Sequence, residues 1–514
     1  MDPAKRERLE RSWAHPFRSA ALGIIDESRF ARFFHDSNGR PNKSLRLILC
    51  VLILKEIFDL TDAEALFELE WNTAWHYALD VIPQEAHTCS KTLYNHRMLL
   101  LDDQEGAGLF EGTTARIIEA AGLHTRRQRM DSTHIVSNIK LLTRLGLFTH
   151  TVTRFLEVLR KEHPRLCGQV PQELLERYLD REGYFADARA SEAPRRLEQT
   201  ALDVHELCLR FGDHRVVRAM DSFKLLRRLY QDQCVPPQME APERIELLEK
   251  PDSSSLQSPS DPDVTYGHKG KGYEVQLAET CVEENPFQVI TAVLLNDSNQ
   301  SDQNQVVSML EQTQRTCGTA PEQMHADAGY GSGENILVAR EKFETELLAP
   351  IGAKGSDKGV TLADFELDAV GQAVLSCSIG EVPIKHKKGR GRVKLAVFAP
   401  EGCQKCPLFT LCPTQTRGEM RALPFTPADI AVARRRIEQQ TPEFKERHKI
   451  RSGIEATNSE LKRSHGLRKL RVRRERRVAL SVRLKVLGMN IKRYMAHLLN
   501  PVIDSAQTAP CCAC

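Results

Sequence analysis

The chain has 514 residues, which is too long for one simple hydrophobic core and predicts about two to four structural units. Hydrophobic residues make up 41% of the chain and charged residues 27%, so a largely disordered protein is excluded. No apolar run has secretory or membrane-spanning length, and the expected location is therefore cytoplasmic. The net charge of +3 hides an excess of basic residues near the C-terminal end.

The first 124 residues have the apolar spacing of helices and predict an all-α N-terminal domain. Residues 44–54 are almost continuously apolar and predict a buried helix. Thr61 followed by Glu64, just ahead of an apolar run, is typical of a capping box at the start of another helix. This region carries no obvious cluster of catalytic side chains.

A β-favouring run with one acidic side chain follows this helical region. Residues 125–139 include Arg129-Met-Asp131-Ser-Thr-His134 and predict the first strand of an α/β core with its turn. Asp131 lies where a strand would present it at the edge of a sheet. His134 falls on the opposite strand face, and we interpret it as a packing residue.

Residues 140–250 return to helical spacing and predict an all-α insertion into the core. A Pro- and Ser-rich link then leads back to the core, residues 251–351. The strands predicted there are 273–280, 289–295, 324–327 and 345–351, and the helices are 304–316 and 334–343. This order predicts a mixed α/β sheet with flanking helices.

A second acidic side chain ends one of these strands, in Met324-His-Ala-Asp327-Ala-Gly-Tyr330. The glycines that follow Asp327 favour a turn, which would present its carboxylate at the sheet edge. His325 shares the strand face of Asp327, where it either packs or hydrogen-bonds beside the carboxylate.

Residues 352–424 are rich in Gly, Lys, Pro and Cys and predict a second insertion. The sequence contains 14 Cys without a secretory signal, which favours free thiols or metal binding over disulfides. The candidate ligands of a structural, tetrahedral Zn²⁺ site are Cys377, Cys403, Cys406 and Cys412. Reduced cysteines in a loop are the alternative. A basic segment at residues 385–392 is either an anion-binding hairpin or a solubilising loop.

The last part of the core, residues 425–499, is predicted to be helical. Thr426 and Thr441 each precede a proline and mark two helix starts. The second helix should end at Gly466, and a third should run over residues 478–499. Residues 500–514, with three further cysteines, are expected to form a disordered tail.

The helix that starts near Thr441 carries a charged stripe. Arg451, Glu455 and Lys462 are spaced by four and seven residues, so an α-helix places them on one face, with Asn458 between them. A surface ladder of ion pairs is one interpretation of this pattern. The other is a carboxylate that holds a metal ion between cations that hold phosphate.

Three acidic side chains on two strands and a helix predict a metal site. Mg²⁺ and similar hard cations prefer oxygen ligands and use a few carboxylates to hold substrate phosphates. Two such ions, Mg²⁺ or Mn²⁺, activate the attacking oxygen and stabilise the leaving oxygen of a phosphoryl displacement. Asp131, Asp327 and Glu455 would then act as metal ligands, and Arg451 and Lys462 as phosphate contacts.

The C-terminal end has the charge of a polyanion-binding surface. Between residues 461 and 493 a single acidic residue, Glu475, opposes a long series of cations. Like charges at this density repel one another without an anionic partner, which favours nucleic acid over a merely solvated face. The basic residues are Lys462, Arg463, Arg468, Lys469, Arg471, Arg473, Arg474, Arg476, Arg477, Arg483, Lys485, Lys492 and Arg493.

These motifs resemble a known family. Asp-x-Gly-Tyr at residues 327–330 and Arg-x3-Glu-x6-Lys from Arg451 to Lys462 resemble the signature of DDE-superfamily insertion-sequence transposases, in the branch marked by Tyr, Arg, Glu and Lys. Asp131-Ser-Thr-His resembles the first Asp motif of that family. The likeness runs from about residue 16 to residue 494. One position departs from the pattern, because His448 stands where the family has Tyr.

The resemblance implies a ribonuclease H-like core that cleaves and joins DNA strands with divalent metal ions. Its implied partners are the terminal inverted repeats of a transposon, the target DNA and a second copy of the chain in a homodimer. The N-terminal domain would recognise element ends or pair protomers, or serve only as a scaffold. A bacterial, nucleoid-associated location would follow. The candidate DNA contacts are Arg451, Lys462, Asn458, His448, Tyr330, Arg468, Arg471 and Arg473.

Several alternatives stay open at this stage. Tyr330 either stacks on a distorted nucleotide or packs beneath its loop. His448 could still stack on a base or contact a phosphate in place of the family tyrosine. At the level of function, the rivals are a catalytically inactive DNA-binding protein derived from a transposon and a nuclease with the same core.

Overall fold

A computed structural model describes most of the chain, namely residues 2–25, 44–180, 191–235, 245–352, 359–368 and 373–500. The tail expected at the C-terminal end lies, from residue 501 onward, outside the described residues. Within the described ranges, every helix is too short or too polar to cross a lipid bilayer.

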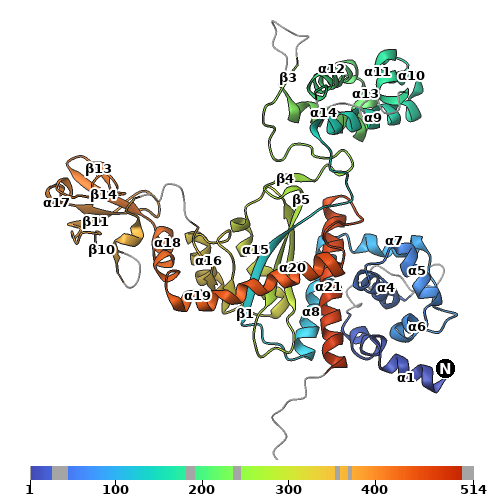
Figure 1. Cartoon of the computed structure of the whole chain (residues 1–514), viewed down its shortest axis with the longest axis horizontal. Coiled ribbons are helices and arrows are strands. Elements are labelled where there is room, and N and C mark those ends of the chain that lie inside the picture. Colours follow the sequence, from blue (N-terminus) through green and yellow to red (C-terminus); the bar gives the residue numbers. More distant parts are fainter. Residues whose placement is uncertain are drawn as a thin grey trace, which may run out of the picture.

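A six-stranded mixed sheet lies at the centre of the molecule (Figure 1). The strand order is β4–β5–β1–β7–β8, and β6 also pairs with β5. The strand β1 runs antiparallel to β5 and parallel to β7, and β7 runs parallel to β8. This sheet confirms the predicted mixed α/β architecture. The strands are β1 Arg127–Ile135, β4 Thr265–Gly267, β5 Gly270–Thr280, β6 Ile290–Asp297, β7 Gln323–His325 and β8 Glu346–Leu348.

The register of the sheet brings two predicted site residues to the same edge. Arg129 on β1 lies opposite His325 on the parallel strand β7. Asp131 lies two residues beyond Arg129, and Asp327 lies two residues beyond His325. Because parallel neighbours present equivalent positions at the same end, the two carboxylates approach each other.

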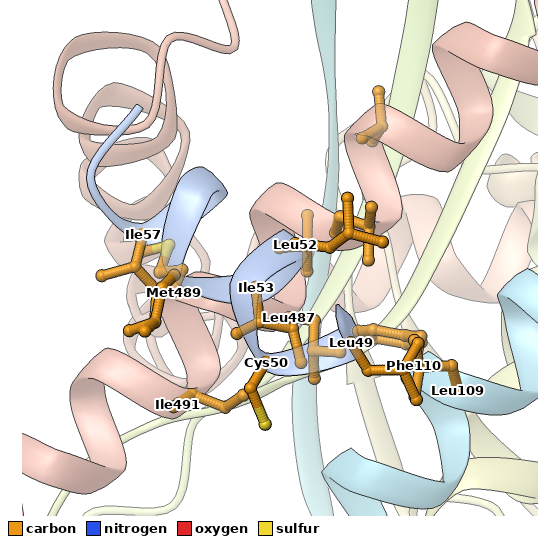
Figure 2. Close-up of a cluster of buried hydrophobic side chains, with 14 of the residues drawn as sticks. Leu49, Cys50, Leu52, Ile53, Ile57, Leu109, Phe110, Leu487, Met489 and Ile491 are labelled. Carbon is orange, nitrogen blue, oxygen red and sulfur yellow. The ribbon is translucent and has the colours of Figure 1, made fainter. Parts of the chain in front are cut away.

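The helices of the N-terminal region pack on the long C-terminal helix α21, Glu475–Leu499. Figure 2 shows Leu49 and Ile53 of α4 close to Phe110 of α8 and to Leu487 and Ile491 of α21. The predicted capping box is confirmed, because the side chains of Thr61 and Glu64 each accept a hydrogen bond from the other's backbone N–H. The helices are α1 Pro3–Glu10, α2 Ala14–Pro16, α3 Leu22–Ile24, α4 Leu45–Ile57, α5 Asp62–Trp71, α6 Thr73–Leu79, α7 Ser90–Leu99 and α8 Asp103–Ala120.

The first insertion forms a helical lobe with its own apolar core, drawn in green at the top of Figure 1. Its helices are α9 Arg144–Glu162, α10 Pro164–Cys167, α11 Gln172–Leu175, α12 Ala193–Phe211, α13 Arg215–Ala219 and α14 Asp221–Gln233. The prediction of an all-α insertion is wrong in one detail, because β2 (Cys234–Val235) pairs with β3 (Glu246–Leu247). Arg144 stabilises the pairing of β2 with β3 by donating hydrogen bonds to the carbonyl oxygens of Gln233 and Leu248.

The second insertion contains a four-stranded antiparallel sheet in the order β11–β12–β14–β13. Figure 1 shows this lobe in orange, on the opposite side of the molecule from the N-terminal helices. The exposed strand β11 carries part of the predicted basic segment. The elements are β9 Glu366–Leu367, β10 Val374–Ser376, β11 Lys385–Lys388, β12 Lys394–Phe398, α17 Pro400–Gln404, β13 Gln415–Arg417 and β14 Met420–Phe425.

The remaining helices flank the sheet, and one of them differs from its prediction. A single helix from Thr441 to Gly466 was expected, but the structure has α19, a 3₁₀ turn and α20 in succession. The Arg129 guanidinium lies against this turn and donates to the carbonyl of Ile450 at 3.0 Å. The bounds are α15 Val306–Cys317, α16 Gly333–Phe343, α18 Pro427–Glu438, α19 Pro442–His448, the 3₁₀ turn Lys449–Ser452 and α20 Gly453–Ser464.

Candidate active site

Asp131 lies on the central strand and is largely buried, with 15% of its side chain exposed. Burial raises the pKa of its carboxyl group, and the negative charge of Asp327 raises it further. Arg451 and Lys269 act in the opposite direction. Asp131 and Asp327 are therefore close enough to repel each other, as two ligands of a shared cation would.

Asp327 occupies a tight turn two residues beyond β7. Its Oδ1 accepts a hydrogen bond of 2.7 Å from the backbone N–H of Gly329. A Cβ on Gly331 would stand 2.0 Å from the carbonyl oxygen of Pro350, so only glycine fits there. Tight packing thus fixes the loop that presents the carboxylate.

The expectation that Tyr330 contacts DNA is corrected by the structure. Tyr330 is fully buried, and its hydroxyl donates a hydrogen bond to Oε1 of Gln276. The side chain therefore packs beneath the Asp327 loop, which was the second of the two interpretations. A buried ring is not available to stack on a base.

Arg451 connects two of the predicted acidic ligands. Its Nη1 lies 3.8 Å from Oδ2 of Asp131, and its Nη2 lies 2.9 Å from Oε1 of Glu455. The side chain of Glu455 is 64% exposed and points toward solvent more than toward the sheet. The guanidinium thus stands between two carboxylates and neutralises part of their charge.

A buried carboxylate that the sequence analysis missed holds α20 against the sheet. Glu279 on β5 pairs with Arg129 at 2.9 Å and with Arg493 of α21 at 2.8 Å. It also accepts a hydrogen bond of 2.6 Å from the hydroxyl of Thr457 on α20. The bond to Thr457 joins β5 to α20, the helix that carries Glu455, and the two ion pairs hold β1 and α21 to the same carboxylate. No specific signal in the sequence pointed to this role, because Glu279 shares its strand with Glu274 and Gln276.

A second missed acid lies beside the candidate site. Asp302 accepts hydrogen bonds from Gln276 at 2.7 Å and from Ser132 at 3.3 Å. A Cβ built on Gly329 would stand 2.9 Å from Asp327 Oδ1 and 3.4 Å from Asp302 Oδ2. Both carboxylates therefore face the same small space, and the glycine leaves it open.

Cations surround the acidic side chains on the solvent side. Lys269 lies 3.3 Å from the Ser132 hydroxyl and 3.4 Å from Glu274. Burial lowers the pKa of Lys462, and the nearby charge of Lys269 lowers it further. The pKa of Lys462 also responds to Arg468 and Asp131, so these groups share one neighbourhood. The acids thus lie within a positive rim that attracts polyanions.

Three of the remaining candidate DNA contacts, His448, Arg471 and Arg473, have partners within the protein. His448 shares a hydrogen bond of 2.9 Å with the carbonyl of Ala326, next to Asp327, and its ring stacks on Phe444. Arg473 donates to a backbone carbonyl of the chain. Arg471 pairs with Asp59 of the N-terminal region at 2.7 Å. Arg468 is exposed. His448 therefore ties α19 to the Asp327 loop, and Arg471 ties two regions together.

The donor set fits a hard cation. Asn458 donates to Asp131 Oδ2 at 3.4 Å, while its own Oδ1 is buried without a hydrogen-bond partner among the described residues. A buried, unpaired amide oxygen beside carboxylates is a ligand that Mg²⁺ accepts. Across the described ranges, however, no three His, Cys, Asp or Glu side chains already stand close enough to hold an ion. Arg451 would have to move aside for Glu455 to join the two aspartates.

A mixed sheet with acidic groups inside a basic rim is typical of an enzyme that acts on nucleic acid. Comparison with protein families agrees with this class. A model described as "Transposase DDE domain" matches residues 378–495, and one described as "Transposase domain (DUF772)" matches residues 10–98. These two matches support a DDE-type insertion-sequence transposase. Comparisons with curated proteins and with solved structures gave no significant match.

The family matches include only part of the candidate site. The DDE match includes Arg451, Glu455 and Lys462, whereas Asp131 and Asp327 lie outside both matched segments. The roles of the two aspartates therefore rest on the geometry of the sheet and on the resemblance of their own motifs, not on the family matches.

Proposed function

We propose that this protein is a transposase that cleaves DNA at transposon ends and joins the freed 3′-hydroxyl to target DNA. The observation that carries the proposal is the convergence of Asp131 and Asp327 at one sheet edge, with Glu455 joined to Asp131 through Arg451. The succession of the antiparallel strands β6, β5 and β1, followed by β7 and β8 parallel to β1, supports a ribonuclease H-like core.

Asp131, Asp327 and Glu455 would hold Mg²⁺ or Mn²⁺, with Asn458 as a further oxygen donor. Two such ions supply activation of the attacking water or 3′-hydroxyl and stabilisation of the leaving oxygen. Before metal ions and DNA bind, Arg451 neutralises part of the charge of the acidic cluster. Once its guanidinium leaves Asp131, it is free to contact a DNA phosphate. Lys269, Lys462 and Arg468 attract and position the DNA backbone.

Joining two transposon ends in one complex requires at least two catalytic sites, which supports a homodimer on double-stranded DNA. The terminal inverted repeats and the target are the substrates in this proposal. A nucleoid-associated location follows from the substrate.

The test uses purified full-length protein and a labelled terminal repeat with Mg²⁺ or Mn²⁺. Asp131→Asn, Asp327→Asn and Glu455→Gln should each lower cleavage by at least roughly 100-fold, because each removes a metal-ligand charge. Glu446→Gln is the matched control, since Glu446 lies on the neighbouring helix α19 and pairs with Lys449 at the surface. Cleavage retained in Asp131→Asn would remove that residue from the site.

The same assay separates the two rival functions. Binding of the terminal repeat with no nicking by the wild-type chain at any metal concentration would support an inactive DNA-binding protein. Nicking without joining of the 3′ end to a second DNA would support a nuclease.

A further inference from the structure

Four cysteines of the second insertion line one small cavity. The cavity measures about 20 Å³ and is lined by Cys377, Cys403, Cys406 and Cys412, with Phe398 and Phe409 beside them. All four are free thiols in the structure. The four come from three segments, since Cys377 follows β10, Cys403 lies in α17, and Cys406 and Cys412 lie in the loop that leads to β13.

The local backbone around these cysteines has the form of short hairpin turns. The N–H of Gly380 donates to the carbonyl of Cys377 at 2.9 Å, and Gly380 has φ of 89°. The N–H of Cys377 donates in turn to the carbonyl of Glu381 at 2.8 Å. On the other side, the N–H of Cys406 donates to the carbonyl of Cys403 at 3.2 Å. Two tight turns thus present sulfur atoms toward each other across the cavity.

The charges around the thiols fit the binding of a cation. The sulfur of Cys403 interacts electrostatically with those of Cys412, Cys377 and Cys406, with which it lines the cavity. Arg421 also interacts with Cys403 and lies over the Phe409 ring at 4.4 Å. Its positive charge would offset the excess negative charge of four thiolates on one divalent ion.

We propose that these four cysteines bind one structural Zn²⁺ ion that fastens the second insertion. Four thiolates from closely spaced turns form the ligand set of closed, tetrahedral zinc sites. Within the described residues the sulfurs do not yet form a closed ligand group. Binding therefore draws the two turns together and releases the thiol protons.

The second insertion has a small apolar core, which a bound metal ion would stabilise. The apolar core of the sheet is small, and three of the cysteines pack against it. Its buried members are Phe365, Val374, Ala396, Phe398, Leu423, Phe425 and Ile430. Small lobes with few buried side chains are commonly fastened by disulfides or metals. Here the ion would hold α17 and the β13–β14 hairpin against the end of β10.

The first test measures zinc in the full-length protein purified under reducing conditions. We expect about one zinc per chain, and a loss of at least roughly 10-fold in the Cys403→Ser/Cys406→Ser double variant. Cys89→Ser is the matched control and should retain the metal, because Cys89 is an exposed thiol in the N-terminal region. Equal zinc content in the double variant and the wild type would overturn the proposal.

A second measurement avoids variants that fail to fold. Wild-type protein is alkylated with and without a zinc chelator, and the labelled cysteines are identified by peptide mass. The four cysteines should react several-fold more only after chelation, whereas Cys89 should react equally in both samples. Equal labelling of the four in both samples, or a mass that shows disulfides between them, would refute zinc binding. Neither result depends on DNA cleavage, so the proposed function is tested separately.

Discussion

The buried Glu279 cluster predicts how firmly α20 is held. Glu279→Ala would leave the guanidinium groups of Arg129 and Arg493 facing each other without the carboxylate that pairs with both. Removing one partner from a buried ion pair costs about 3–5 kcal/mol, because the remaining charges are left uncompensated. The hydroxyl of Thr457 also loses its acceptor. Glu279→Ala should therefore destabilise the packing of α20 on the sheet more than it destabilises the two inserted lobes.

Hydrogen exchange of the backbone amides in α20 measures this effect locally. A cost of about 3 kcal/mol raises the opening equilibrium by roughly 100-fold or more, and the exchange rates should rise by the same factor. Glu460→Ala is the matched control, because Glu460 pairs with the same Arg493 at 3.2 Å but is partly exposed. That control should cost less than about 1 kcal/mol. Equal exchange in the two variants would refute the argument that Glu279 fixes the helix.

Three further predictions follow from single side chains. A Cβ on Gly453 would stand 1.8 Å from Arg129 Nη1, so Gly453→Ala should lower the free energy of unfolding by about 1–3 kcal/mol in a denaturant titration. Gly112→Ala is the control and should not destabilise α8, because open space surrounds Gly112. Burial lowers the pKa of His465 in the folded protein, so the unfolded state binds more protons below about pH 6.5 and stability falls as the pH drops further. His465→Gln should flatten that pH dependence by up to about 1.4 kcal/mol per pH unit, and an unchanged slope would contradict this. Lys462→Ala should weaken DNA binding and reduce the slope of log binding constant against log salt concentration by about one unit, the value for one phosphate contact. An unaltered slope would show that Lys462 does not contact the DNA backbone.

Local features of the fold could be predicted because neighbouring residues determine them. The capping box at Thr61 and the left-handed Gly466 depend on a few consecutive residues. The pairing of Arg451 with Glu455 also followed from their spacing, although Arg451 lies in a 3₁₀ turn and not in the predicted helix. Four residues still span about one turn in either conformation, so the error in helix type did not change which side chains meet.

The cluster of cysteines was also visible in the sequence, since Cys403, Cys406 and Cys412 lie close together in the chain. The position of Cys377 depended on the packing of β10 against the rest of the lobe. The structure places it at the same cavity. Whether the four bind zinc stays a prediction for the metal analysis described above.

The amino-acid sequence by itself determined the composition of the candidate site: which acids, which cations and which turn-forming glycines were available. Only the tertiary structure decided their partners. Tyr330 became a buried hydrogen-bond donor, Glu279 became the anchor of α20, and Asp302 came to face the same space as Asp327. The physical reason is that burial and pairing depend on contacts between separate segments of the chain, 54 residues apart for Tyr330 and Gln276 and 178 for Glu279 and Thr457. No local pattern of side chains specifies such contacts, because they arise only when the strands and helices pack together.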